Sequence, residues 1–145
     1  MKNKIFIFDL DDTLYKEIDF LYSAYREIAG WIELKFSLKG IYAFMLETYK
    51  EQADVFSRLI DTYDLSLTKA DLLSIYRSHR PNIRLELDTL KALEVLKQDF
   101  ILGMITDGRS ITQRNKFQAL GLEQFIENEN LVISEEFGSE KPSIC

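Results

Sequence analysis

Short apolar runs separated by longer amphipathic stretches set the pattern of this chain. Residues 4–8 (Lys-Ile-Phe-Ile-Phe) form a continuous apolar run that ends in the acidic cluster Asp9-Leu10-Asp11-Asp12. Such a run is typical of a strand buried on both faces, as in a parallel sheet. Residues 100–105 give a second run of this kind, and residues 131–133 predict a short third strand.

Apolar residues recur at spacings of three and four between these runs, which predicts amphipathic helices. The predicted helices cover residues 16–36, one stretch over 41–60, and then 68–77, 87–96 and 110–120. Thr68 with Asp71 resembles a capping box that opens one helix, and Pro81 prevents that helix from continuing. Ser110 can cap the last helix and Gly121 can terminate it. Residues 61–66 are expected to connect helices, and residues 134–143 to form a polar loop.

Strands that alternate with helices predict an α/β fold with a parallel sheet. The three helices expected over about residues 16–80 look like an insertion after the first strand. We therefore expect an α/β core made of residues 1–14 and 84–145, with a helical domain at residues 15–83. The segment from Tyr15 to Tyr63 holds 11 of the 18 aromatic residues, which either form a helical-bundle core or line a substrate pocket.

Composition excludes several classes of function. The chain has 145 residues and a formal net charge of −6 without a basic run, which disfavours sequence-independent nucleic-acid binding. One cysteine, Cys145, excludes a disulfide framework or a Cys-based zinc site within one chain. His79 is the single histidine and has no predicted role; its solitude disfavours a His-rich metal site or a Ser-His-Asp triad. No segment resembles a signal peptide or a membrane span, so we expect a cytoplasmic protein that does not bind membranes.

Candidate chemistry gathers where the predicted strands end. Asp9 and Asp11 follow the first strand, Thr106 and Asp107 the second, and Lys141 the third. Carboxyl ends of parallel strands meet at one edge of a sheet, which is where α/β proteins bind ligands. Two carboxylates about 4 Å apart repel by about 4 kcal/mol at an effective dielectric near 20. A phosphate would add to that repulsion, so the cluster favours a cation, and oxygen ligands suit Mg²⁺. Taken singly, each residue could equally belong to a solvated turn or loop.

Three segments together resemble the signatures of the haloacid-dehalogenase-like hydrolase superfamily. Phe8-Asp9-Leu10-Asp11-Asp12-Thr13-Leu14 resembles the first, Ile105-Thr106-Asp107-Gly108 the second, and Glu140-Lys141-Pro142-Ser143 the third. The resemblance covers nearly the whole chain and implies a Rossmann-like parallel sheet with an α-helical bundle cap inserted after the first motif.

The resemblance also implies a mechanism. Asp9 would attack phosphorus and form an aspartyl-phosphate, while Asp11 would protonate the leaving oxygen and then activate water. Asp9 and the backbone carbonyl of Asp11 would bind Mg²⁺. Thr106, with Asp107, and Lys141 would hold the transferring phosphoryl group. Acidic Asp11 argues for a phosphatase over a dehalogenase.

Two further residues of these motifs, Thr13 and Gly108, are expected to support the site. Helical caps of this kind go with small phosphorylated metabolites, including sugar phosphates and nucleoside monophosphates, by family resemblance. The expected function is therefore that of a Mg²⁺-dependent phosphatase acting on a small phosphorylated metabolite.

The family's fourth signature, an acidic pair that completes the metal site, has no counterpart after Lys141. We therefore expect a core that is shortened at its C-terminus. Residues Glu135, Glu136 and Glu140 precede the lysine and are expected to form a solvated acidic loop. Residues 5–8 would then lie at an edge of the sheet, which predicts a homodimer, an exchanged element or poor solubility.

Two rival functions remain at this stage. A phosphate-accepting receiver domain would use Asp11-Asp12, Thr106 and Lys141-Pro142, but it needs a middle strand where residues 41–80 predict helices. An inactive scaffold that binds a partner would account for the missing fourth signature. Phosphatase activity that requires both Mg²⁺ and Asp9 would reject the scaffold.

Overall fold

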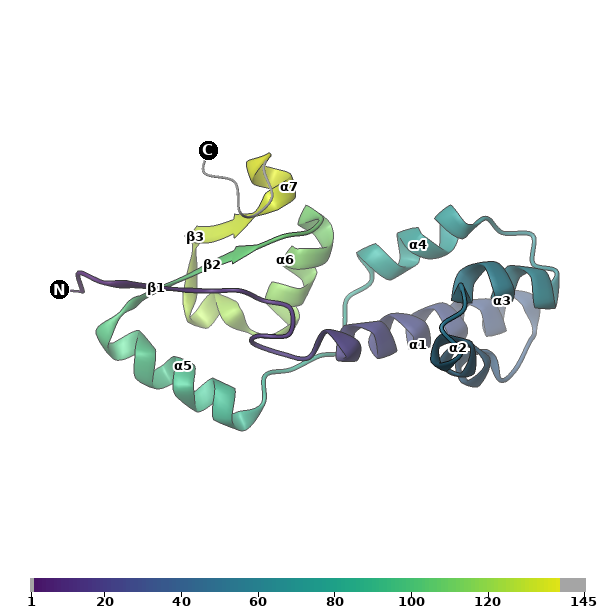
Figure 1. Ribbon diagram of the computed structural model, residues 1–145, viewed down its shortest axis with the longest axis horizontal. Coiled ribbons are helices and arrows are strands. Elements are labelled where there is room, and N and C mark those ends of the chain that lie inside the picture. The colour runs from purple at the N-terminus through teal and green to yellow at the C-terminus, as the bar shows by residue number, and fades with distance from the viewer. Residues whose placement is uncertain (1, 139–145) are drawn as a thin grey trace. The chain divides into compact units, whose positions relative to one another are not determined.

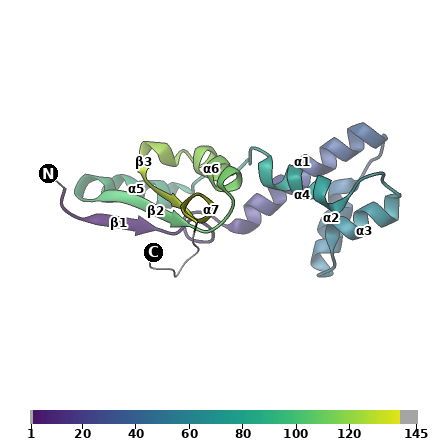
Figure 2. The same ribbon diagram turned by 90° about the horizontal axis from the view of Figure 1, so that it is seen from above.

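Within residues 2–138, the part of the chain that the computed structural model describes, three parallel strands form one sheet. The strands are β1 (Ile5–Phe8), β2 (Ile101–Thr106) and β3 (Ile126–Ile133), and β2 lies between the other two (Figures 1 and 2). The chain divides into two units: one holds the residues up to Phe20 and those from Arg80 onward, and the other is Leu21–His79. The predicted α/β class with a parallel sheet is confirmed.

The register of the sheet brings the expected motifs to one edge. Phe8, the last residue of β1, pairs with Met104, and Thr106, the last residue of β2, pairs with Ile133. All three strands run in the same direction, so the segments that follow them leave the sheet at the same end. Buried Leu102, Met104 and Thr106 anchor the central strand.

The first strand is not buried on both faces as its sequence predicted. Ile5 is 60% exposed and Ile7 55%, and Phe6 is exposed as well. The physical reason is its place in the sheet: within residues 2–138, β1 pairs with β2 alone and therefore forms an edge. The expectation that these residues lie at an edge is confirmed, whereas the inference of burial from an apolar run was wrong.

The third strand is longer than expected. It begins at Ile126, where Leu102 is its partner, and its register shifts before Leu131 pairs with Met104. The polar residues 127–130 lie at this irregularity. The first half of the strand therefore has no run of apolar residues from which a strand could be predicted.

In the described part of the sheet unit there are four further elements: α5 (Leu87–Asp99), α6 (Ser110–Ala119), the 3₁₀ helix η1 (Leu122–Gln124) and α7 (Ser134–Phe137). Arg109, not Ser110, is the N-cap residue of α6, because Ser110 is already helical. Gly121 follows α6 at φ 67°, a conformation that suits glycine after a helix. The expected polar loop after β3 begins instead with α7.

Four helices, not three, lie between Glu17 and Ser78, a stretch that is described throughout (Figure 1). They are α1 (Glu17–Phe36), α2 (Ile41–Lys50), α3 (Val55–Tyr63) and α4 (Lys69–Ser78). The stretch expected as one helix breaks between α2 and α3. Gln52 adopts φ 58°, and the carboxylate of Asp54 accepts a hydrogen bond from the backbone N–H of Ser57, which starts α3.

The helical unit has its own hydrophobic core. Its fully buried members include Ile28, Ile41, Met45, Leu59 and Leu72. The capping box of Thr68 and Asp71 is confirmed, and α4 ends before Pro81, with His79 in an extended conformation.

Some of the aromatic residues belong to this core, because Tyr25 and Phe56 are buried and their rings lie 6.2 Å apart. Trp31 lies partly exposed with the Lys35 ammonium 4.9 Å from its ring centre. Within residues 2–138, no helix combines the length and the apolar character needed to span a bilayer.

Candidate active site

The loop after β1 is shaped by two buried leucines. Leu10 is fully buried and Leu14 nearly so, and the backbone N–H groups of Thr13 and Leu14 both donate to the Leu10 carbonyl. Asp12 sits in this turn at φ 59°, and its carboxylate accepts a hydrogen bond from the backbone N–H of Glu17 at 2.9 Å. Asp12 therefore stabilises the first turn of α1, where a carboxylate also matches the helix dipole.

The Asp11 carboxylate is held at both oxygens. Oδ1 accepts hydrogen bonds from the Tyr15 hydroxyl at 2.6 Å and from the Lys116 ammonium at 2.8 Å. Oδ2 accepts a hydrogen bond from the Gln113 side-chain nitrogen at 3.1 Å. The partners on α6 lie more than 100 residues away in the sequence, so the sheet and α6 together place this side chain.

Burial acts to raise the pKa of Asp11, but the hydrogen bonds from Lys116, Tyr15 and Gln113, with the charge of Lys116, bring it below the usual value. Asp11 is therefore ionised at neutral pH. Nearby Glu17 shows the opposite effect, because burial and the negative charge of Asp11 raise its pKa. The charges of Asp11 and Glu17 therefore influence each other after the end of β1.

Lys116 is the buried cation of this site. It is 4% exposed, and its ammonium lies 4.4 Å from the ring centre of Phe20 and 5.9 Å from that of Tyr15. A buried ammonium is costly unless it is paired, and here the pairing comes from Asp11.

Thr106 ends β2 and is 1% exposed. Its hydroxyl oxygen lies 2.7 Å from the side-chain nitrogen of Gln113. Two residues further on, the backbone N–H of Gly108 donates to the Ser134 hydroxyl at 2.9 Å. The turn after β2 is therefore held by both α6 and the beginning of α7.

The acidic residues Glu135 and Glu136 are exposed to solvent as expected, but they belong to the helix α7 and not to a loop, and both are paired. Glu135 accepts a hydrogen bond from the backbone N–H of Ser110 at 3.0 Å, at the N-terminus of α6. Glu136 accepts from the Ser110 hydroxyl and from two nitrogens of Arg114. These contacts dock α7 on α6; Glu140 lies outside the described residues.

The structure brings only some of the predicted site residues together. Gln113 joins Asp11 to Thr106, so these two lie together. Asp9 and Thr13 are exposed in the loop after β1, and Asp107 is exposed after β2. Lys141 lies outside the described residues.

Gln113 and Lys116 are site residues that sequence reasoning missed. They stand three apart on α6, and both are buried. The signal was weak: a helix in an α/β fold must bury one face, and residues 110–119 contain few apolar residues to do so. The buried face had to include polar side chains, but the pattern alone does not say which.

The described residues fit Mg²⁺ as part of an oxygen site. The candidate ligands are the Asp9 carboxylate and the Asp11 backbone carbonyl, and both Asp11 carboxylate oxygens accept hydrogen bonds from protein donors. Oxygen ligands suit Mg²⁺, which commonly keeps several waters. Among residues 2–138, no three or more His, Cys, Asp or Glu residues cluster as a metal site, so these two groups form only part of a coordination shell.

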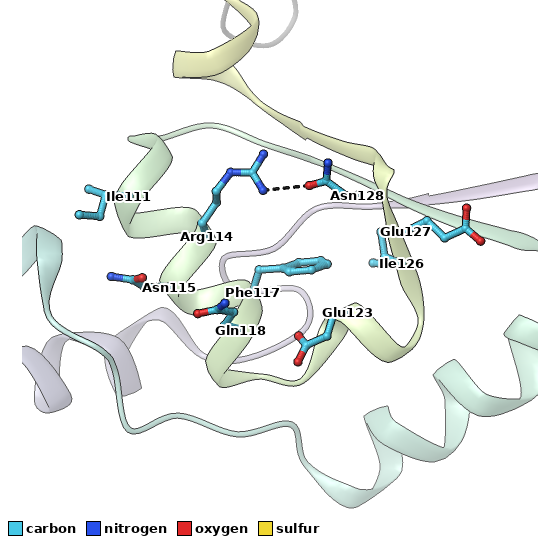
Figure 3. A pocket seen from close by; sticks show the side chains of 9 residues that line it. All are labelled: Ile111, Arg114, Asn115, Phe117, Gln118, Glu123, Ile126, Glu127 and Asn128. Atoms are coloured by element: carbon cyan, nitrogen blue, oxygen red, sulfur yellow. Dashed lines mark hydrogen bonds between the residues drawn. The ribbon is translucent and has the colours of Figure 1, made fainter.

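A separate groove lies over α6, η1 and the beginning of β3 (Figure 3). Its lining includes Phe117, Glu123 and Glu127, and none of the predicted catalytic residues. Arg114 also lines it, donating to Asn128 at 3.0 Å as well as to Glu136. The two carboxylates and the paired arginine disfavour a phosphate there.

Comparison with known proteins gives this geometry a context. A family model described as haloacid dehalogenase-like hydrolase matches residues 6–144. The chain is 29% identical over 150 residues to a glyceraldehyde 3-phosphate phosphatase of Methanocaldococcus jannaschii, and 28% identical over 154 residues to that of Methanopyrus kandleri. These alignments cover 95% and 97% of the chain. The chain spans 65% of the length of each relative.

The fold is similar to that of a solved haloacid dehalogenase-like hydrolase from Bacillus subtilis. The TM-score is 0.63 at 20% identity, and the alignment covers 99% of this chain and 68% of the other. That protein was solved with magnesium bound.

Proposed function

Because the chain belongs to the haloacid dehalogenase-like hydrolase family, we propose that it carries the site of a Mg²⁺-dependent phosphatase. The observation that carries the proposal is the junction of Asp11 and Thr106 through Gln113 at the carboxyl ends of β1 and β2. This arrangement offers a carboxylate for proton transfer beside a hydroxyl that can donate to a phosphoryl oxygen.

In the proposed reaction, an Asp9 carboxylate oxygen attacks phosphorus, and the bond from phosphorus to the ester oxygen breaks. The leaving oxygen takes a proton from Asp11. Water then attacks the aspartyl-phosphate while Asp11 accepts a proton, which releases phosphate and restores Asp9.

Asp11 has the protonation state that the second step needs, although its lowered pKa makes it a weaker base than a free carboxylate. Its lowered pKa leaves it ionised and able to accept a proton from water. For the first step Asp11 must gain a proton, and an incoming phosphate dianion favours this by like-charge repulsion.

Mg²⁺ held by Asp9 and the Asp11 carbonyl would supply positive charge that offsets the anionic phosphoryl group. Thr106 would donate its hydroxyl proton to a phosphoryl oxygen. Asp107 would help shape the turn that receives this group, and Lys141 would add a further positive charge.

The substrate class proposed is a small phosphorylated metabolite. Both curated relatives are named glyceraldehyde 3-phosphate phosphatases, so a triose phosphate is the first compound to test. The chain aligns with 65% of those proteins, and for that reason the substrate is a proposal to be measured on this chain itself.

The test measures phosphate release by the purified chain from glyceraldehyde 3-phosphate and from p-nitrophenyl phosphate, with Mg²⁺ and with EDTA. We expect release that requires Mg²⁺ and that Asp9→Asn abolishes. Asp61→Asn, which removes the same charge from an exposed position on α3, is the matched control and should keep wild-type activity.

Two outcomes would overturn the proposal. Release that persists in Asp9→Asn would reject an aspartyl-phosphate. No release from a panel of phosphorylated metabolites, by a chain shown to be folded by circular dichroism, would favour the inactive scaffold.

A further inference from the structure

Two buried polar side chains of α6 point to a function beyond packing. Gln113 is 2% exposed and Lys116 is 4% exposed, and both contact Asp11. Burying an amide and an ammonium costs free energy that apolar side chains would not cost. Their hydrogen bonds offset this cost, and they go to Asp11, in the loop after β1, and to Thr106, at the end of β2.

The direction of the Gln113 hydrogen bonds follows from the chemistry of Asp11. Both oxygens of Asp11 accept hydrogen bonds, one of them from the buried Lys116 ammonium, so the amide turns its NH₂ group toward Asp11 Oδ2. The same nitrogen lies 2.7 Å from Thr106 Oγ1. Thr106 must therefore accept this bond, and its own hydroxyl proton points elsewhere.

Lys116 fixes the second oxygen of the same carboxylate. Its ammonium donates to Asp11 Oδ1 at 2.8 Å, on the oxygen that also accepts from Tyr15. Gln113 and Lys116 stand three residues apart and so project from the same side of α6. The helix α6 therefore supplies a hydrogen-bond donor to each of the two oxygens of the Asp11 carboxylate.

Gly108 leaves the space that Gln113 occupies. A Cβ atom at this position would lie 3.0 Å from both Cγ and Cδ of Gln113, so the side chain of Gln113 would have to shift by a few tenths of an ångström. Gly108 adopts φ 144°, a conformation that favours glycine. The turn after β2 and the α6 amide thus fit together.

We propose that Gln113 and Lys116 are positioning residues, which hold the Asp11 carboxylate in place and turn the Thr106 hydroxyl proton toward the phosphoryl group. The catalytic part of this proposal rests on the proposed phosphatase function. Catalytic groups must be held closely in their productive geometry, and a misplacement of about 1 Å can cost about 100-fold in rate.

The first experiment is kinetic and uses Gln113→Met, which keeps the length of the side chain and removes its donors. We expect kcat to fall by about 100-fold while KM changes little, because the correct placement of Asp11 and Thr106 matters most in the transition state. The matched control is Gln118→Met on the exposed side of α6, which should behave as wild type. A folded Gln113→Met enzyme with wild-type kcat would overturn the proposal.

A second variant covers the case in which Gln113→Met does not fold. Gly108→Ala pushes on the Gln113 side chain without changing its chemistry, and it also strains the turn after β2, because Gly108 has φ 144°. We expect the same selective loss of kcat, and an unchanged kcat in a folded Gly108→Ala chain would also overturn the proposal.

The second experiment needs no substrate. A double-mutant cycle on thermal unfolding combines Gln113→Met with Thr106→Val. The loss of stability in the double variant should be smaller than the sum of the single losses, because both single changes break the same hydrogen bond. Additive losses would overturn the proposal. If wild-type chain released no phosphate, the proposed function would fall, and this cycle would still decide whether Gln113 holds Thr106.

Discussion

The guanidinium of Arg114 donates two parallel hydrogen bonds to the Glu136 carboxylate, from Nε and from Nη2, each 2.6 Å long. This fork joins the middle of α6 to α7. Charge-assisted bidentate pairs are the stronger members of their class, and they fix orientation as well as distance. In the sequence, α7 ends four residues before Lys141, so this contact fixes the element that leads into the third motif.

Replacing Glu136 should have a small, pH-dependent effect on stability. The hydrogen bonds from Arg114 and Ser110 hold the pKa of Glu136 below its usual value of 4.5. Their contribution is therefore fully present above pH 4.5 and is lost as pH falls through the lower, folded-state pKa. Both side chains are partly exposed, so we expect Glu136→Gln to cost about 0.5 kcal/mol at pH 7.

Urea unfolding of wild type and Glu136→Gln at pH 7 and at pH 3 measures this difference. Glu129→Gln, on an exposed part of β3, is the control for loss of one negative charge. A difference between wild type and Glu136→Gln that grew on acidification would contradict the assignment.

Removing the Asp11 carboxylate should destabilise the sheet unit more strongly. Asp11→Asn would leave the ammonium of the buried Lys116 side chain without its ion-pair partner. Removing one partner of a buried ion pair typically lowers the free energy of unfolding by about 3 kcal/mol or more. Asp9→Asn, at an exposed position in the same loop, should change the free energy of unfolding far less.

Chemical denaturation of the two variants makes this comparison. The double variant Asp11→Asn with Lys116→Met should regain part of the loss, because it no longer buries an unpaired charge. Equal stability of Asp11→Asn and Asp9→Asn would mean that Lys116 does not depend on Asp11.

The sequence pattern predicted those elements whose local and tertiary signals agree. The capping box at Thr68 and the apolar run of β2 are of this kind, because each depends on residues that are close together in the sequence. The break at Gln52 was missed because α2 and α3 continue one apolar periodicity on both sides of it. Burial of β1 was wrongly predicted because a run of apolar residues does not say how many strands flank it.

The site residues that could be predicted were likewise those with a local signal in the sequence. Asp11 and Thr106 could be found because each belongs to a contiguous motif at the end of a strand. Gln113 and Lys116 could not, since their roles arise from contacts with Asp11 across more than 100 residues of sequence. An isolated Gln or Lys in a polar helix is ordinarily solvated.

The exposed edge of β1 should make this chain associate with itself. Among residues 2–138 only β2 pairs with β1, and apolar edge strands readily pair with another chain. An antiparallel pairing of two copies about an axis between Phe6 and Ile7 would set Lys4 of one copy opposite Asp9 of the other. We therefore expect a concentration-dependent dimer in sedimentation velocity.

Ile7→Lys should shift this equilibrium toward the monomer, because it introduces a charge on the apolar edge. Leu34→Lys makes the same change at a strongly exposed position on α1 and should leave association as it is. A wild-type chain that sediments as a monomer at all concentrations would refute the dimer.

Tyr25 should make the helical unit sensitive to alkali. Burial raises the pKa of Tyr25 to about 12, and the neighbouring Tyr76 and Tyr49 add to the effect. An unfolded tyrosine loses its proton near pH 10. Between about pH 10 and pH 12 the unfolded chain therefore releases a proton that the folded chain keeps, and stability must fall as pH rises through this range.

Tyr25→Phe removes this titration while keeping the ring that packs against Phe56. The free energy of unfolding of wild type, minus that of Tyr25→Phe, should be constant below pH 10 and should decrease above it. Urea unfolding followed by far-ultraviolet circular dichroism at pH 9, 10 and 11 measures this difference. Tyr22→Phe, at a partly buried position on α1, provides the comparison for loss of one phenol group. If the Tyr25→Phe difference stayed flat from pH 9 to pH 11, the phenol would titrate alike in the folded and unfolded chains, and burial of the ring would not extend to its hydroxyl.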